Sequence, residues 1–207
     1  FFRSGQFKAA LAKTVDHLFG TSFQNEQQFN EGRVVTQDGF RFRLRQDDIA
    51  EVIGYSGSGK ELDIPETVQG HVVTRVAPFA FSRQRQITAV SIPDTVDSIG
   101  QEAFYICPSL QQLKLPARLK IIGKNAFNYC RALKSVIVPT GTIHIDRHAF
   151  YDCTALKTIS IPDAVGFMGE KVFGADGDAK VECTIVCRQD SYVEHYAKEN
   201  GILCSFV

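Results

Sequence analysis

The sequence predicts one strand-rich α/β repeat solenoid with a 23-residue period. This prediction rests on an evenly spaced series of phenylalanines, on a short apolar run that ends in proline, and on columns of apolar residues that keep the same phase. The phenylalanines stand 23 residues apart, at Phe81, Phe104, Phe127, Phe150 and Phe173. A single unit of this length cannot bury its apolar side alone, so we expect the units to stack and to fold together.

The proline-terminated runs predict one short strand in each repeat. They are VSIP, LKLP, VIVP and ISIP, and they end at Pro93, Pro116, Pro139 and Pro162. In LKLP, the leucines point one way while Gln112 and Lys114 point the other, which is the alternation of a strand. Proline ends the strand because it has no backbone N–H to donate.

A cysteine column follows the phenylalanines by three residues, at Cys107, Cys130 and Cys153. We expect these side chains and the phenylalanines to point inward and to form the structural core of the repeat. A metal site would need ligands paired at short spacing, so the column is predicted to hold buried thiols that act as small apolar groups. A period of 23 residues falls within the range of leucine-rich repeats.

The segment IGKNAFNYCRALKSVIVP and its copies resemble the BspA-like (Treponema pallidum type) leucine-rich repeat, whose pattern is roughly IGxxAFxxCxxLxxLxIP. The final CTIVCRQDSYVEHYAKENGI is similar to the segment that closes such solenoids. The resemblance implies a leucine-rich-repeat right-handed superhelix. We expect no enzyme, because the sequence shows no clustered polar pocket. The resemblance also implies a bacterial protein, extracellular or at the cell surface, that contacts host or neighbouring-cell proteins.

Four segments are predicted along the chain. They are an N-terminal helical segment at 1–32, an N-terminal β-hairpin cap at 33–70, leucine-rich repeats at 71–173, and a C-terminal strand-helix-strand cap at 174–207. Apolar residues at helical spacing from Phe7 to Leu18 predict the first helix, and the Asp38-Gly39 pair between two alternating runs predicts the hairpin.

The C-terminal helix has predicted start and stop signals. Ser191 and Glu194 have the spacing of a capping box, and Gly201 is expected to end the helix. The segments CTIVC and ILCSFV on either side are predicted strands.

One interruption breaks the repeat register near its start. From Pro65 to Phe81 the spacing is 16 residues, whereas the other copies take 11. We expect the five extra residues to form a loop near 69–73.

Composition excludes two classes of partner. The chain carries 23 Lys and Arg residues and 23 Asp and Glu residues, so its net charge is zero. Nucleic-acid-binding proteins usually have a clear basic excess, so we expect no nucleic-acid partner. No apolar run approaches the ~20 residues of a membrane helix, so we expect no membrane insertion in this segment. The chain does not begin with Met, so a missing secretion signal says nothing about the compartment.

The stretch GYSGSGKEL at 54–62 almost matches a phosphate-binding loop, which would make the protein a nucleotide-dependent enzyme. The residue after Lys60 is Glu61, where such a loop has Ser or Thr for the metal ion. The following ELDIP is strand-like, whereas a phosphate loop leads into a helix. We therefore predict a Gly/Ser turn between two strands, with no cofactor.

Three further cysteines, Cys183, Cys187 and Cys204, fall on the two predicted C-terminal strands. Cys183 and Cys187 share a strand face, so either could pair with Cys204. The alternatives of a disulfide and of three free thiols remain open at this point.

The five histidines, His17, His71, His144, His148 and His195, are scattered. His144 and His148 have the spacing of a helical metal pair, but we expect no helix between them. Their columns, which we align with Lys120 or Ser98 and with Glu102 or Asn125, are predicted to be solvent-exposed. We expect no metal site and no catalytic residues.

The predicted binding surface is the concave face of the strands, formed by the outward residues of the four repeats. These residues are Ala89, Ser91, Gln112, Lys114, Ser135, Ile137, Thr158 and Ser160. One charge among eight positions disfavours an ionic partner, and a flat polar surface suits a protein or a glycan.

We therefore expect a monomeric, non-enzymatic adhesion or interaction module. The alternatives are a structural spacer within a larger surface protein and, least favoured, an enzyme with a nucleotide site at 54–60.

Overall fold

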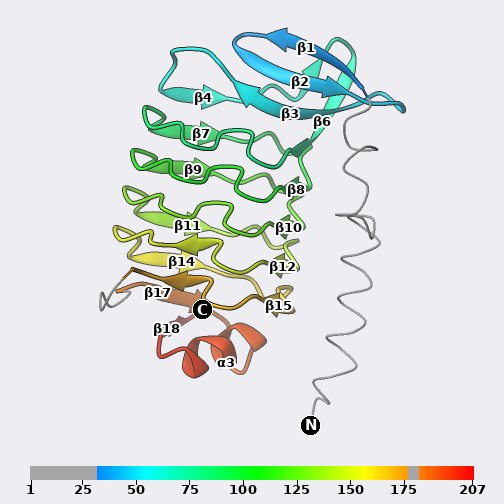
Figure 1. Ribbon diagram of the computed structural model, residues 1–207. Coiled ribbons are helices and arrows are strands. Elements are labelled where there is room, and N and C mark those ends of the chain that lie inside the picture. Colours follow the sequence, from blue (N-terminus) through cyan, green and yellow to red (C-terminus); the bar gives the residue numbers. More distant parts are fainter. Residues whose placement is uncertain (1–31, 177–181) are drawn as a thin grey trace.

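The computed structural model describes residues 32–176 and 182–207. Over these residues the chain is a strand-rich solenoid with a helix near its C-terminus, which confirms the predicted fold class there (Figure 1). The helix predicted within 1–32 lies outside the described residues. The elements are β1 (Arg33–Gln37), β2 (Phe40–Leu44), β3 (Ile49–Tyr55), β4 (Glu61–Asp63), β5 (Thr67–Val68), β6 (His71–Val76), β7 (Ala89–Ser91), β8 (Ser98–Ile99), β9 (Gln112–Lys114), β10 (Ile121–Ile122), β11 (Ser135–Ile137), β12 (His144–Ile145), β13 (Phe150–Tyr151), β14 (Thr158–Ser160), β15 (Phe167–Met168), β16 (Phe173–Gly174), β17 (Thr184–Cys187), α3 (Tyr192–Glu199) and β18 (Leu203–Phe206).

Each repeat contributes a three-residue strand and a two-residue strand to two separate rows (Figure 1). The three-residue strands are divided between two sheets. One has the order β4-β7-β9, and the other has the order β11-β14-β17-β18, in which β17 and β18 have four residues each. The strands β8, β10, β12 and β15 continue a sheet that begins with β1, β2, β3 and β6. Pairing between repeats is parallel and joins residues one period apart, such as Val90 with Leu113 and Ile122 with Ile145.

The phenylalanine column runs through the middle of the core, as predicted. All five rings are buried. Neighbouring ring centroids lie 4.9 to 6.0 Å apart, and their planes differ by 11° at most. This spacing is close to the ~4.8 Å between strands, so each ring fills the space contributed by its own turn of the solenoid.

Two columns of non-glycine residues adopt the left-handed backbone conformation in the turns that carry the phenylalanines. They are Phe79, Glu102, Asn125, His148 and Lys171, and Arg83, Ile106, Tyr129 and Asp152, with φ between 46° and 63°. Alternate residues of these turns donate their N–H groups to the next turn, as Glu102 does to Lys124 and Ile106 to Asn128, both at 2.9 Å. These bonds between turns hold residues in a conformation that L-amino acids rarely adopt.

The predicted N-terminal hairpin is present. β1 and β2 pair in antiparallel fashion, and the turn residues Asp38 and Gly39 both have positive φ, 52° and 81°. Positive φ at both central residues is the geometry that a two-residue hairpin needs, and it explains the Asp-Gly pair.

The prediction of a loop near 69–73 was wrong, because the extra residues form a second hairpin. β5 and β6 pair in antiparallel fashion through Val68 and His71. Their turn residues Gln69 and Gly70 have φ of 48° and 82°, and Val73 is fully buried. The glycine accepts the left-handed turn, and the buried valines Val68 and Val73 fix the hairpin to the core.

The C-terminal cap follows the prediction. The N–H of Glu194 donates to Ser191 Oγ at 3.2 Å, and Glu194 Oε2 accepts from the N–H of Asp190 at 2.6 Å. Gly201 has φ +65° just after the helix, and β18 pairs in parallel with β17. The hydroxyls of Tyr192 and Tyr196 accept the N–H groups of Met168 and Val172 at 3.1 Å, so helix α3 satisfies donors of the last turn.

Candidate functional site

The eight predicted binding residues lie together on the row of three-residue strands. We call the outward side chains of β4, β7, β9, β11 and β14 the strand ribbon. Its members are Glu61, Asp63, Ala89, Ser91, Gln112, Lys114, Ser135, Ile137, Thr158 and Ser160. The residue between each pair, such as Val90 or Ile159, belongs to the core. Alternation along each strand therefore leaves one face free, and its role in binding stays a prediction.

Two acidic members of the strand ribbon were missed from the sequence. Glu61 and Asp63 are exposed on β4, which pairs with β7 so that Glu61 faces Ala89 and Asp63 faces Ser91. The signal was available, because ELDIP already begins the repeat register. The ribbon therefore has an acidic end, which the estimate of one charge in eight positions did not include.

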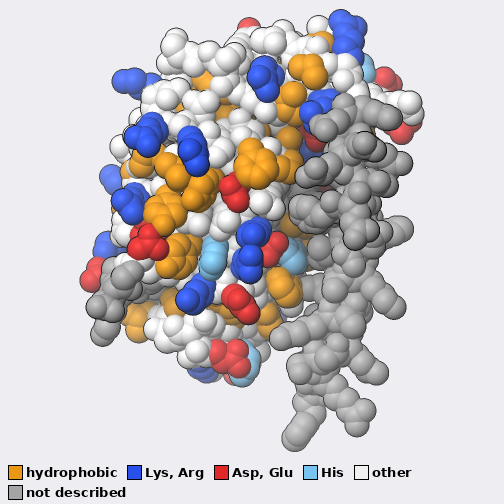
Figure 2. All heavy atoms as spheres, in the orientation of Figure 1, with side chains coloured by type: hydrophobic (Ala, Val, Ile, Leu, Met, Phe, Trp, Pro, Cys, Tyr) orange, Lys and Arg blue, Asp and Glu red, His pale blue; other side chains and the backbone are white. Residues whose placement is uncertain are grey.

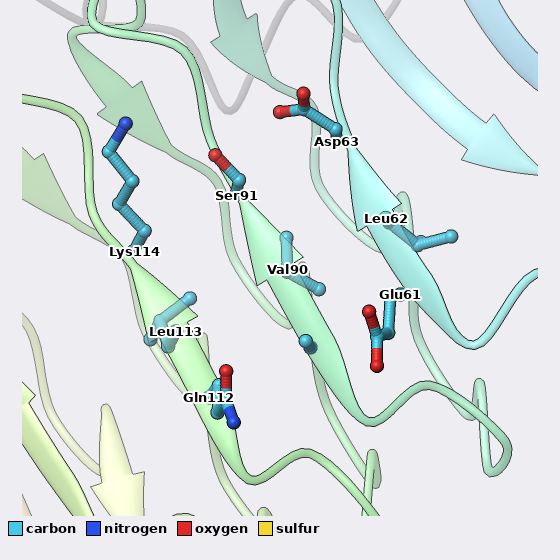
Figure 3. A pocket seen from close by; sticks show the side chains of 9 residues that line it. Glu61, Leu62, Asp63, Val90, Ser91, Gln112, Leu113 and Lys114 are labelled. Atoms are coloured by element: carbon cyan, nitrogen blue, oxygen red, sulfur yellow. The ribbon is translucent and has the colours of Figure 1, made fainter.

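A shallow groove of about 580 Å³ crosses β4, β7 and β9. Figure 3 shows Glu61 and Asp63 on one side of it and Gln112 and Lys114 on the other, with Ser91 on the strand between. The groove exists because Ala89 and Ser91 are small, whereas the side chains on both flanking strands are longer.

The GYSGSGKEL stretch is a connection between two strands, as predicted. Gly54 and Tyr55 end β3, and β4 begins at Glu61. The N–H of Gly59 donates to the hydroxyl of Tyr55 at 3.0 Å, and the carbonyl of Lys60 accepts from Thr88 at 2.7 Å. A strand follows the stretch where a phosphate loop would lead into a helix, so the segment does not have the context that binds an anion.

The cysteine column is buried and ordered by hydrogen bonds. The thiols of Cys107, Cys130 and Cys153 donate to the carbonyl oxygens of Phe81, Phe104 and Phe127 at 3.2 to 3.3 Å. Burial raises the pKa of Cys107 and of Cys153 to about 12 and raises the pKa of Cys130 well above its ordinary value. Neutral thiols of this kind are poor nucleophiles and poor metal ligands, in agreement with a structural role.

The three C-terminal cysteines are free thiols. Cys204 lies opposite Ile185, so its two diagonal neighbours are Cys187 at the end of β17 and Cys183, which directly precedes β17. Burial raises the pKa of Cys187 to about 11, and its contact with the Cys204 thiol adds to this shift. Of the two candidate partners, Cys187 is thus the one in contact with Cys204.

The predicted solvent exposure of the His144 column was wrong. β12 pairs with β10 so that His144 lies beside Ile121 and not beside Lys120, and the residue is 8 % exposed. It stacks on Phe167 with 4.4 Å between centroids, and burial lowers its pKa. The alignment with Lys120 had slipped by one residue, and in a strand such a slip exchanges the two faces. The alignment with Ser98 was in register, and Ser98 is buried as well.

His148 is half-buried and sits in a left-handed turn, 5.0 Å from the ring of Tyr151. Within 32–176 and 182–207, no group of three or more His, Cys, Asp or Glu side chains is placed to hold a metal ion. No helix in the described part of the chain has the length and apolar character to span a membrane.

Comparison with a family model places this architecture among known repeats. Residues 55–180 match the BspA type leucine rich repeat region in six copies. No curated protein matches the sequence.

Solved structures of bacterial repeat proteins are similar to this one. A leucine rich cell surface protein from Faecalibacterium prausnitzii shares 27 % identity and a TM-score of 0.63 over 79 % of this chain and 47 % of that one. A leucine-rich repeat protein from Bacteroides capillosus shares 26 % identity and a TM-score of 0.53 over 70 % of this chain and 99 % of that one. The leucine rich repeat protein of T. pallidum, at 22 % identity and a TM-score of 0.54 over 84 % of this chain and 98 % of that one, supports the fold alone. The chain thus spans about half of the Faecalibacterium protein.

Proposed function

We propose that this chain, which belongs to the BspA-type leucine-rich repeat family, is a non-enzymatic module that binds a protein partner through the strand ribbon. The partner is a surface or matrix protein of a host or of a neighbouring cell, and the module acts outside the cell or at its surface. The similar Faecalibacterium structure, described as a cell surface protein, supports this location.

The strand ribbon carries the proposal because its backbone is rigid and its side chains are free. Parallel pairing holds neighbouring strands in register within each of the two sheets, as Ser135 pairs with Thr158 and Ala89 with Gln112. A pre-ordered surface loses little conformational entropy when a partner binds. Repeat solenoids offer such extended surfaces, and their variable positions decide what is bound.

Ile137 is the member of the ribbon that suits a contact centre. Its side chain is 77 % exposed, between the polar residues of β9 and β14. An apolar group in the middle of a polar surface loses contact with water when a partner covers it, which stabilises a complex. The groove at β4, β7 and β9 then receives a projecting side chain of the same partner.

The test is capture of host matrix or neighbouring-cell proteins by the immobilised chain, followed by affinity measurement on the captured protein. The double variant Ile137→Glu, Gln112→Glu should weaken binding at least about tenfold, since it adds two charges to be desolvated. Its melting temperature should not change, because both side chains are exposed. The matched control Ala164→Glu changes an exposed residue outside the strands and should bind as the parent does.

Unchanged affinity of the double variant would eliminate the strand ribbon as the binding surface. The structural-spacer alternative would then be favoured. If the chain is a structural spacer, it should capture no protein. Its length, rather than its surface chemistry, should then control the function of the larger surface protein to which it belongs.

A further inference from the structure

We infer that the chain has a second binding site, for a neutral sugar unit of a glycan, formed by Tyr105, Tyr129 and Tyr151 around the buried carboxamide of Asn128. Tyr105, Asn128 and Tyr129 belong to the turns between the two rows of strands, and Tyr151 ends the short strand β13, so none of them is part of the strand ribbon. Figure 2 shows hydrophobic side chains gathered across the middle of the solenoid, next to basic, acidic and histidine side chains.

The tyrosine rings are half-buried and held in place by their neighbours. Tyr105 and Tyr129 pack edge to face with 5.9 Å between centroids. The hydroxyl of Tyr129 donates to Asp176, and that of Tyr151 donates to the carbonyl of Ala175 at 2.8 Å. Rings that are already fixed lose little entropy on binding, which is why tyrosine is frequent in binding surfaces.

Arg131 is fixed in the same way. Its guanidinium donates to the carboxylate of Asp152 at 2.6 Å, and that carboxylate is buried. The guanidinium carbon lies 5.2 Å from the centre of the Tyr129 ring. Its remaining N–H groups are available as donors, because the arginine side chain is 55 % exposed.

Asn128 is the observation that points to a ligand. It occupies the same repeat column as Tyr105 and Tyr151, one period after the first and one before the second, and it is 6 % exposed. Its Nδ2 donates to Asn125 Oδ1 at 3.1 Å, but its Oδ1 has no hydrogen-bond partner among the described residues. A buried acceptor without a donor is unfavourable and needs an explanation.

A sugar fits this combination of groups. A pyranose ring has an apolar C–H face that packs against an aromatic ring, and hydroxyls at its edge that both donate and accept. One hydroxyl would donate to Asn128 Oδ1 when the side chains that bury this atom move aside, and another would accept from Arg131. The unit is neutral because the charges nearest the rings are already engaged, Arg131 by Asp152 and Asp176 by Tyr129.

The experiment is saturation-transfer NMR on the whole chain with four probes: methyl α-glucoside, methyl β-galactoside, methyl α-mannoside and N-acetylglucosamine. Saturation of the aromatic protons of the protein should transfer to ring C–H protons of at least one probe, with millimolar affinity. Tyr129→Leu and Asn128→Leu should each weaken that probe at least about tenfold. Asn128→Leu removes the acceptor that has no partner, so its melting temperature should equal that of the parent chain. Tyr151→Leu provides a second variant that lacks one aromatic ring.

The strand-ribbon variant Ile137→Glu, Gln112→Glu is the matched control and should bind the probe as the parent chain does. This separates the sugar site from the protein-binding proposal, since each can fail alone. Absence of transfer to all four probes would overturn the inference. Transfer that persists in folded Tyr129→Leu, Tyr151→Leu and Asn128→Leu would also overturn it.

Discussion

The thiol of Cys130 donates a hydrogen bond to the carbonyl oxygen of Phe104 at 3.3 Å, which ties one turn of the solenoid to the turn before it. The same contact joins Cys153 to Phe127 and Cys107 to Phe81. The cysteine column therefore contributes hydrogen bonds between turns as well as apolar packing.

Replacement of Cys130 by alanine should lower the free energy of unfolding by about 1–3 kcal/mol, because it removes a buried side chain and leaves a buried carbonyl with one partner fewer. Urea denaturation gives this value. The control Cys204→Ala changes a half-buried cysteine on β18 and should stay within about 0.5 kcal/mol of the parent. Equal losses of unfolding free energy in the two variants would contradict a stabilising role for the hydrogen bond between Cys130 and Phe104.

Thiol reactivity should separate the cysteines. Burial raises the pKa of Cys107 and of Cys153 to about 12, so thiolate is scarce near neutral pH. In the native protein an aromatic disulfide reagent should label Cys204 first and leave the cysteine column unmodified until the chain unfolds. Peptide mapping by mass spectrometry identifies the labelled sites, and rapid native labelling of Cys130 would contradict the buried column.

Removal of one ring from the phenylalanine column should be costly. Phe127 is fully buried between Phe104 and Phe150, with centroids 5.2 and 5.3 Å away. Phe127→Ala leaves a cavity and should cost about 3–5 kcal/mol in the free energy of unfolding. Ile137→Ala on the strand ribbon should cost less than about 0.5 kcal/mol, because that side chain is 77 % exposed. Similar losses in denaturant titrations would be incompatible with this core.

His144 should make stability depend on pH. Burial lowers its pKa below the ordinary value, although nearby Asp146 opposes the shift. Below about pH 6.5 the unfolded chain therefore binds more protons than the folded chain, and the free energy of unfolding falls as the pH falls. The melting temperature should be lower at about pH 5.5 than at about pH 7.5, and His144→Leu should reduce this difference.

His148 should contribute to the same effect, because burial and Arg147 also lower its pKa. His148→Gln should remove a further part of the pH dependence. If the melting temperature of His144→Leu depends on pH as strongly as that of the parent chain, folding does not hinder protonation of His144, which would contradict this prediction.

The tyrosines of α3 provide a test of the cap. The buried hydroxyl of Tyr196 accepts the N–H of Val172, and that residue is fully buried. Tyr196→Phe leaves this donor without a partner and should lower the free energy of unfolding by about 1–3 kcal/mol. Tyr192→Phe removes the matching bond to Met168, but Tyr192 is 38 % exposed, so water can replace it and the loss should be smaller.

Much of the fold could be predicted from the sequence, because the apolar pattern of each repeat is local. The spacing of Phe104 and Phe127 and the alternation around Leu113 were enough to predict stacked turns with a buried ring in each. The Asp38-Gly39 turn and the Ser191 cap are also local signals, since each depends on a few adjacent residues.

The candidate sites were less predictable. The strand ribbon followed from alternation, but Glu61 and Asp63 were left out because the outward residues were taken only from the four regular repeats, although ELDIP was already identified as strand-like. Tyr105, Tyr129 and Asn128 were not singled out, because nothing in their own segments shows that they meet.

By itself the sequence determined the repeat period, the residues of the core and the two ends of the described solenoid, since burial of a periodic apolar pattern requires them. Only the tertiary structure decided which polar side chains meet across turns, and that His144 is buried. It also decided that Ile106 and Tyr129, neither of them glycine, take the left-handed conformation. The physical reason is that hydrogen bonds between turns impose this backbone, and their partners lie about one period away in the chain, beyond the reach of local preference.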